Sequence, residues 1–170
     1  MIRLIGLPIL ATTICVFAQT PCERLKSLSL ANAVITAAET VPNQRFEGPG
    51  TSSGPPAHCR VSVVLAPSPD SHIETEVWLP VTNWNRKFLA LGNGGWAGNV
   101  PVRSSTGLHG DGYAIASTDT GHQGDATDAS FAVSHPDKIK DFAYRAVHEM
   151  TIQSKAIIAA FYGSGPRLSY

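Results

Sequence analysis

Two continuous apolar runs, each followed by a loop of glycine or polar residues, constrain the fold of this 170-residue chain most strongly. Residues 88–91 lead into residues 92–98 (Gly-Asn-Gly-Gly-Trp-Ala-Gly), and residues 113–117 lead into residues 118–122 (Thr-Asp-Thr-Gly-His). An uninterrupted apolar run of this length is typical of a strand that is buried on both faces. The two runs therefore predict two strands in the interior of a sheet.

The flanking segments complete an α/β pattern. Residues 58–65 and 73–79 alternate between apolar and polar positions on either side of a Pro-Ser-Pro-Asp turn, which predicts an antiparallel pair of strands. Apolar residues recur at steps of three and four over residues 142–161 and predict a long helix, and residues 168–170 begin another strand. A crossover helix between strands favours a parallel sheet with helices on its faces.

The expected long helix has recognisable ends. Ser134 and Asp137 resemble a capping box, with Pro136 near the first turn, and Gly163 lies where the helix should stop. A second, short helix is expected within residues 25–38, which are moderately apolar.

The N-terminus predicts export. Arg3 precedes an apolar run over residues 4–17, and Val16 and Ala18 fit the −3 and −1 positions of a cleavage site. We therefore expect a signal peptide over residues 1–18 and a mature domain over residues 19–170, in a secreted or periplasmic protein. An uncleaved N-terminal anchor is the alternative.

The cysteines agree with export. Cys15 lies in the expected signal peptide, which leaves Cys22 and Cys59 to form one disulfide in an oxidising compartment. The bond would close a loop of about 38 residues, worth roughly 3–4 kcal/mol in chain entropy.

Net charge restricts the partners: 13 basic and 13 acidic residues balance, whereas nucleic acid and anionic membrane surfaces require a basic patch. We expect neither as a partner.

The glycine-rich loop is the strongest candidate site. Gly94 and Gly95 would let a ligand approach the backbone closely, and free N–H groups in such a loop can form an anion or oxyanion pocket. Trp96 could stack on an aromatic or sugar ligand. A tight surface turn is the alternative interpretation, and a P-loop is excluded because Gly-Lys-Ser/Thr is lacking.

A second candidate site follows the other apolar run. Asp119 and His122 could ligate a metal or form an acid–base pair. Because aspartate side chains also accept hydrogen bonds from turn N–H groups, we favour a structural role and expect no metal. Residues 50–54 match G-x-S-x-G literally, but no strand precedes them, so they are not expected to form a nucleophile elbow.

In their order, these motifs resemble the tannase and feruloyl esterase family. The matching stretches are residues 84–85, 92–98, 112–114, 118–122, 141–146, 148, 155, 161–163 and 169–170. Cys22 and Cys59 fit the N-terminal disulfide of the family. The resemblance implies an α/β-hydrolase fold with a mixed, mainly parallel sheet and flanking helices. It also implies serine esterase chemistry on small esters of aromatic acids such as gallate or ferulate, with the Gly95 N–H as an oxyanion donor.

The same resemblance implies parts that these 170 residues do not contain. In the family a Gly-Cys-Ser-x-Gly-Gly elbow follows the strand that begins at Ser169-Tyr170, and the acid, the catalytic histidine and a lid with a calcium site come later. We therefore expect an N-terminal portion of such an enzyme, inactive by itself and without a cofactor of its own. The rival hypotheses are an exported binding module that uses Trp96, and a metal-dependent hydrolase that uses Asp119 and His122.

Overall fold

The computed structural model describes residues 19–43, 54–101 and 106–170. The expected signal peptide (1–18) lies outside the described residues, as do residues 50–53 of the G-x-S-x-G match. Among the described residues, no helix combines the length and apolar character needed to span a bilayer.

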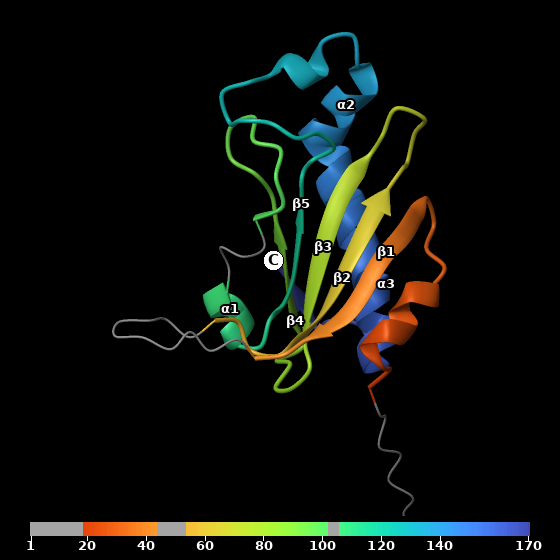
Figure 1. Ribbon diagram of the computed structural model, residues 1–170, viewed down its shortest axis with the longest axis vertical. Helices are drawn as coiled ribbons and strands as arrows, with labels where there is room; N and C mark the ends of the chain where they lie inside the picture. The colour runs from red at the N-terminus through yellow and green to blue at the C-terminus, as the bar shows by residue number, and fades with distance from the viewer. Residues whose placement is uncertain (1–18, 44–53, 102–105) are drawn as a thin grey trace, which may run out of the picture.

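A mixed six-stranded sheet with the order β1-β2-β3-β5-β4-β6 forms the centre of the described structure (Figure 1). The strands β1, β2, β3 and β5 pair antiparallel in succession, whereas β4 pairs parallel with both β5 and β6. This arrangement confirms the expected α/β class with a mixed sheet, but the described strands are not mainly parallel, because three of the five pairings are antiparallel. The strands are β1 (Ala33–Val41), β2 (His58–Leu65), β3 (Ile73–Pro80), β4 (Lys87–Leu91), β5 (Ala114–Thr118) and β6 (Leu168–Ser169).

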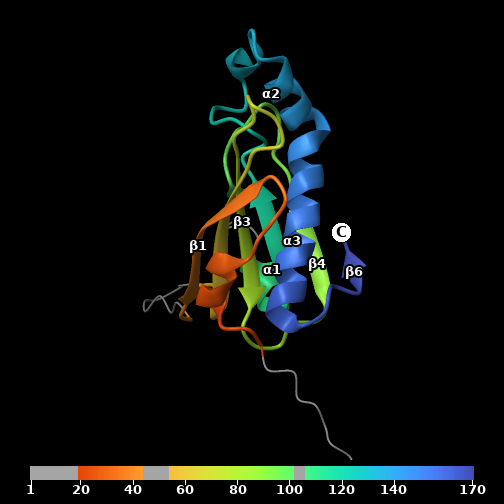
Figure 2. The same cartoon turned by 90° about the vertical axis from the view of Figure 1, so that its right-hand side faces the viewer.

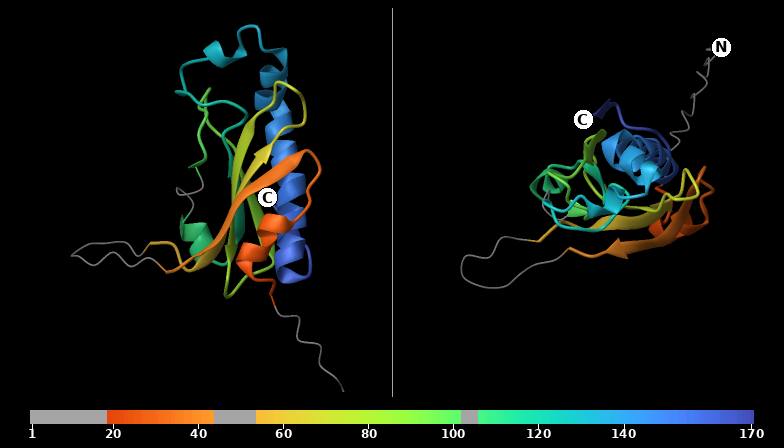
Figure 3. Two further views of the ribbon diagram at one scale, coloured as in Figure 1. Left: turned by 45° about the vertical axis from the view of Figure 1, so that its right-hand side comes forward. Right: turned by 90° about the horizontal axis from the view of Figure 1, so that it is seen from above.

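One long helical segment covers a face of the sheet. It consists of α2 (Pro136–Lys140), a π-helical turn η4 (Asp141–Arg145) and α3 (Ala146–Tyr162), and α3 lies along the strands (Figures 2 and 3). The predicted long helix is therefore confirmed. Its buried side chains pack with those of the strands because both present apolar rows to the same interior. The core includes Val61, Val77, Leu79, Phe88, Ala116, Met150, Ile157 and Ile158.

The predicted strands behave as their sequence patterns indicate, with one difference. The alternating pair forms β2 and β3, and β5 is buried along its whole length. In β4, which pairs with β6 at Lys87 and Phe88, only Phe88 is fully buried and the other four residues are half-buried. The start of a strand at Leu168 is confirmed by that pairing.

The expectation of a short helix within residues 25–38 is wrong. A 3₁₀ helix, η1 (Cys22–Ser27), ends near the start of that range, and most of the remainder belongs to β1. The β-branched residues Val34, Ile35 and Thr36 favour a strand, and β1 pairs with β2 along its length. Hydrogen bonding to β2 therefore outweighs the weak helical pattern.

The helix ends differ from expectation at one side. The N-cap position is occupied by His135 without a side-chain cap bond, and Ser134 adopts a left-handed φ of 63° instead of capping. At the other end Gly163 terminates α3 with a φ of 75°, as predicted.

A disulfide joins Cys22 of η1 to Cys59 of β2, with 5.5 Å between their Cα atoms. This bond confirms the predicted pairing and fixes the N-terminal segment against the sheet. Both cysteines are buried in the main hydrophobic core.

Replacing both Cys22 and Cys59 with alanine should lower the free energy of unfolding by about 3 kcal/mol, because the 37-residue separation is then unrestrained in the unfolded chain. Chemical denaturation of the variant and of the parent protein, each with and without reductant, measures the effect. Reductant should destabilise only the parent. Equal stability of the oxidised parent and the variant would contradict the prediction.

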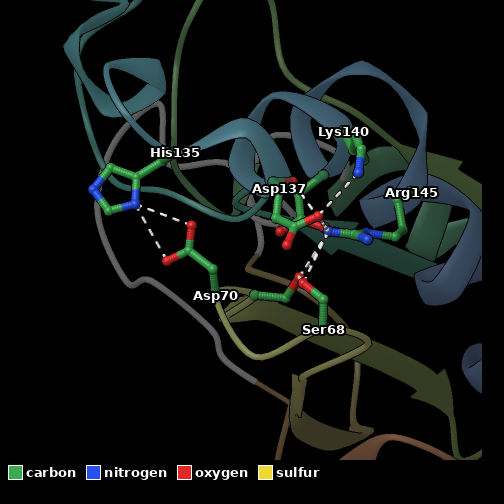
Figure 4. A network of polar contacts seen from close by, with 8 residues as sticks. Ser68, Asp70, His135, Asp137, Lys140 and Arg145 are labelled. Atoms are coloured by element: carbon green, nitrogen blue, oxygen red, sulfur yellow. Dashed lines mark hydrogen bonds and ion pairs between the residues drawn. The ribbon is translucent and has the colours of Figure 1, made fainter.

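A polar network fixes the start of the long helix to the β2–β3 turn (Figure 4). Arg145 donates to the side chain of Asp141 at 2.5 Å, to the hydroxyls of Ser68 and Ser71 at 3.2 and 2.9 Å, and to the carbonyl of Asp137 at 3.0 Å. The Asp141 side chain is fully buried. Because Arg145 and Asp141 belong to the π-helical turn, the network joins that turn to the β2–β3 turn.

Candidate functional site

Two loops meet at one edge of the sheet. Because β4 and β5 are parallel, their carboxyl ends lie at the same edge, and the loops that follow them extend from the upper end of the sheet in Figure 1. The N–H of Gly98 donates to the carbonyl of Gly124 at 3.0 Å, and the N–H of Gly124 donates back at 3.3 Å. The structure therefore brings the two candidate sites of the sequence together.

Asn93 fixes the start of the glycine-rich loop. Its side-chain amide donates to the carbonyls of Asn99 and Thr118, both at 2.9 Å. One side chain thus ties the loop to itself and to the end of β5. Sequence reasoning did not single out Asn93, although an amide donor directly after a buried strand is a recognisable signal for such a role.

Both backbone groups of Trp96 are engaged by the second loop. The Trp96 N–H donates to the carbonyl of Ala126 at 2.8 Å, and the Trp96 carbonyl accepts from Nε2 of His122 at 2.8 Å. These bonds hold the turn formed by residues 94–96 from one side.

Gly95 is exposed at this turn and has a φ of 59°. A Cβ at this position would lie 2.7 Å from the carbonyl oxygen of Ala126, so the left-handed backbone and the close approach both favour glycine. Its N–H donates no hydrogen bond within the described part of the chain. At Gly94, by contrast, a Cβ would meet nothing within 4 Å.

Trp96 carries an aromatic surface next to Gly95. Its side chain is 43% exposed, and its ring lies 5.0 Å from that of Phe142 and 6.2 Å from that of Phe131. The two phenylalanines support one part of the indole, while the rest faces solvent. His122 belongs to the same cluster because its ring stacks on Phe131 at 3.6 Å.

Asp119 binds backbone rather than a neighbouring side chain. Its carboxylate accepts the N–H groups of Glu74 at 2.9 Å and Gly121 at 2.8 Å. Burial raises the pKa of Asp119 to about 7, although both hydrogen bonds act in the opposite direction. Since His122 donates to Trp96, each of the two predicted polar residues has its own backbone partner.

The described part of the chain contains no set of ligands for a metal ion. No group of three or more His, Cys, Asp or Glu side chains able to hold a metal ion occurs there.

Sequence reasoning missed a pair of buried histidines, His58 and His109, whose rings are in contact. The ring of His58 stacks on Trp78 at 4.2 Å and meets that of His109 edge to face at 5.0 Å. Nδ1 of His109 lies 3.3 Å from the carbonyl oxygen of Tyr113. Burial, followed by the neighbouring His58, lowers the pKa of His109 to about 4.

His109 should make stability depend on pH in the acid range. The unfolded imidazole takes up a proton near its ordinary pKa of about 6.5, whereas the folded one stays neutral down to about 4. The unfolded state therefore binds more protons in this window, and stability should fall as pH drops through it. Denaturation of a His109→Phe variant from pH 7 to pH 4 should show a shallower decline than the parent; an identical slope would contradict this.

Comparisons with known proteins identify the family and agree with the fold. The family described as tannase and feruloyl esterase matches residues 59–170. An uncharacterised esterase from Xanthomonas campestris pv. campestris is 39% identical across all of this chain, which corresponds to 31% of that relative. Feruloyl esterase B from Aspergillus niger is 38% identical over 66% of this chain and 21% of its own length.

Solved structures give the same result. The crystal structure of feruloyl esterase B from Aspergillus oryzae superposes with a TM-score of 0.77 and 30% identity, covering 88% of this chain and 30% of that one. Tannin acyl hydrolase from Aspergillus niger shares the fold, with a TM-score of 0.58 and 24% identity. The chain thus spans about a third or less of the length of these relatives. The match to residues 59–170, together with the identity across the whole chain, shows that it belongs to the tannase and feruloyl esterase family.

Proposed function

We propose that this chain forms the N-terminal part, residues 19–170, of an α/β-hydrolase domain that hydrolyses carboxylic esters of phenolic acids such as gallate or ferulate. Family membership and the names of the feruloyl esterase and tannin acyl hydrolase relatives support the reaction and the substrate class. This chain is proposed to contribute one of the two N–H donors of the oxyanion hole.

The N–H of the exposed residue Gly95 carries this proposal, because it donates no hydrogen bond within the described part of the chain. Attack on an ester carbonyl places negative charge on its oxygen, and a backbone N–H already aimed at that position stabilises the charge without reorganisation. Gly95 lies in the loop that follows β4. The next residue, Trp96, is held through both its N–H and its carbonyl. The second N–H donor and the nucleophilic serine, oriented by a histidine and an acid, complete the proposed site.

Trp96 and Gly94 supply the proposed contact with the acid part of the substrate. The exposed part of the Trp96 indole lies next to the Gly95 turn, and aromatic pairs contribute about 0.5–1.5 kcal/mol beyond area burial. Gly94 has no side chain to obstruct a ligand at this edge. A phenolic ring over Trp96 would place the ester carbonyl near Gly95.

The 170-residue polypeptide alone is proposed to be inactive. Among the described residues, the ring nitrogens of His58, His122 and His135 contact Pro56, Trp96 and Asp70, and none of these histidines contacts a serine hydroxyl. Export is proposed as well: the apolar N-terminus supports it, as does the Cys22–Cys59 disulfide, because such bonds persist in oxidising compartments.

Hydrolysis assays with methyl gallate and methyl ferulate test the function. The full-length product of the gene should hydrolyse at least one of them and should be labelled by a serine-reactive fluorophosphonate, whereas a polypeptide ending at Tyr170 should do neither. A strict metal requirement without labelling would favour the metal-dependent hydrolase. Ligand binding that depends on Trp96, with no ester turnover, would favour the binding module.

A further inference from the structure

We propose that His122 is a positioning residue: it holds the turn formed by residues 94–96 so that the Gly95 N–H points to the ester carbonyl. The inference rests on the proposed function and assigns a role to a side chain outside the reacting atoms. It follows from the bonds that His122 makes and from the way its ring is fixed.

The hydrogen bond to Trp96 determines which ring nitrogen acts as the donor. A carbonyl oxygen only accepts, so Nε2 of His122 carries the proton that it donates at 2.8 Å. Nδ1 is buried and has no hydrogen-bond partner among the described residues. The one hydrogen bond that this buried imidazole makes within the described part of the chain is therefore directed at the backbone of the glycine-rich loop.

The imidazole is held by Phe131 of the short 3₁₀ helix η3 (Ser130–Ala132), on which it stacks, and by the edge of Phe142 in the helical segment, 5.7 Å between ring centres. Its ring lies nearly parallel to that of Phe131, with 13° between the planes. The preceding residue, Gly121, has a φ of 91°, and its carbonyl accepts from Nζ of Lys138 at 3.1 Å. A Cβ on Gly121 would lie 2.9 Å from Cβ of Asp141. The backbone at His122 is thus fixed, and its side chain adds a hydrogen bond to the glycine-rich loop.

Removing this donor should affect the transition state more than substrate binding. Without His122, the Trp96 carbonyl loses its bond to the second loop, and the turn keeps the bond from the Trp96 N–H to Ala126 and the bond from the Ala97 N–H to Gly94. Gly95 can then leave its left-handed conformation. An oxyanion donor acts mainly when charge develops on the substrate oxygen, so we expect kcat to fall while KM changes little.

Two substitutions at this position test the proposal in the full-length gene product. His122→Phe keeps a ring for stacking on Phe131 and removes the donor, whereas His122→Gln restores an amide N–H. We expect kcat of the phenylalanine variant to fall about 10- to 100-fold, as for a small misplacement of a catalytic group, with KM within about 2-fold. The glutamine variant should recover part of kcat.

Hydrogen exchange provides a readout that does not require activity. The peptide covering residues 92–99 should exchange faster in His122→Phe than in the parent protein. His135→Phe is the matched control: that histidine is exposed and pairs with Asp70, so kcat and exchange in this peptide should stay unchanged.

The outcomes separate the inference from the function on which it rests. An active parent whose His122→Phe variant keeps its kcat and its exchange rate would overturn the role of His122 alone. Equal loss of kcat in the phenylalanine and glutamine variants would also contradict it, because the donor would then be irrelevant. A parent protein that hydrolyses no ester would overturn the proposed function itself.

Discussion

Replacing Gly95 with alanine should lower kcat for phenolic esters about 100- to 1000-fold, the loss typical of a missing oxyanion donor. The added Cβ would lie 2.7 Å from the carbonyl oxygen of Ala126, and a φ of 59° is unfavourable for alanine. The turn must therefore shift and carry the N–H away from the substrate oxygen. Steady-state kinetics with methyl ferulate measures kcat and KM separately.

Gly94→Ala is the matched control for this variant. It adds the same methyl group one residue earlier, where no protein atom lies within 4 Å, so the turn should keep its shape and kcat should remain within about 3-fold of the parent value. KM should rise, because Gly94 is proposed to contact the substrate. Similar losses in the two variants would show that the loop merely tolerates no extra bulk. That result would remove the support for Gly95 as a donor.

Replacing Arg145 with methionine should lower the free energy of unfolding by about 3–5 kcal/mol, the cost of leaving a buried charge without its partner. Asp141 is fully buried, and Arg145 is its ion-pair partner at 2.5 Å. The substitution also removes the donors to Ser68 and Ser71, which connect the helix to the β2–β3 turn. Denaturant unfolding followed by circular dichroism measures the change.

Arg60→Met is the control for charge removal as such. Arg60 pairs with Glu39, and both side chains are substantially exposed, at 32% and 51%. Such surface pairs contribute about 0–1 kcal/mol. A loss at Arg145 no larger than that at Arg60 would contradict a stabilising role for the buried network.

Local patterns were sufficient to predict most of the fold. Alternation defined β2 and β3, the apolar runs defined β4 and β5, and the periodicity over residues 142–161 defined the long helix. The pattern failed at β1, where nine residues of mixed burial show no clear alternation and the strand depends on pairing with β2. The π-helical turn η4 likewise had no signal in the sequence.

The candidate site was only partly predictable, for a similar reason. Gly95 and Trp96 stood out because glycines clustered directly after a buried strand. The bond between His122 and Trp96 joins residues 26 positions apart, and the contact between His58 and His109 depends on the packing of distant segments. Interactions of this kind are set by tertiary structure and leave no local spacing to detect.

A crystal structure of the full-length gene product with an aryl phosphonate bound to its nucleophile would show whether the Gly95 N–H donates to the oxyanion. The phosphonyl oxygen represents the oxygen of the tetrahedral intermediate. We expect it about 2.7–3.1 Å from the backbone nitrogen of Gly95, within the range for an oxyanion donor. A phosphonyl oxygen bound by other donors, with the Gly95 N–H directed away from it, would contradict the role of Gly95 as an oxyanion donor.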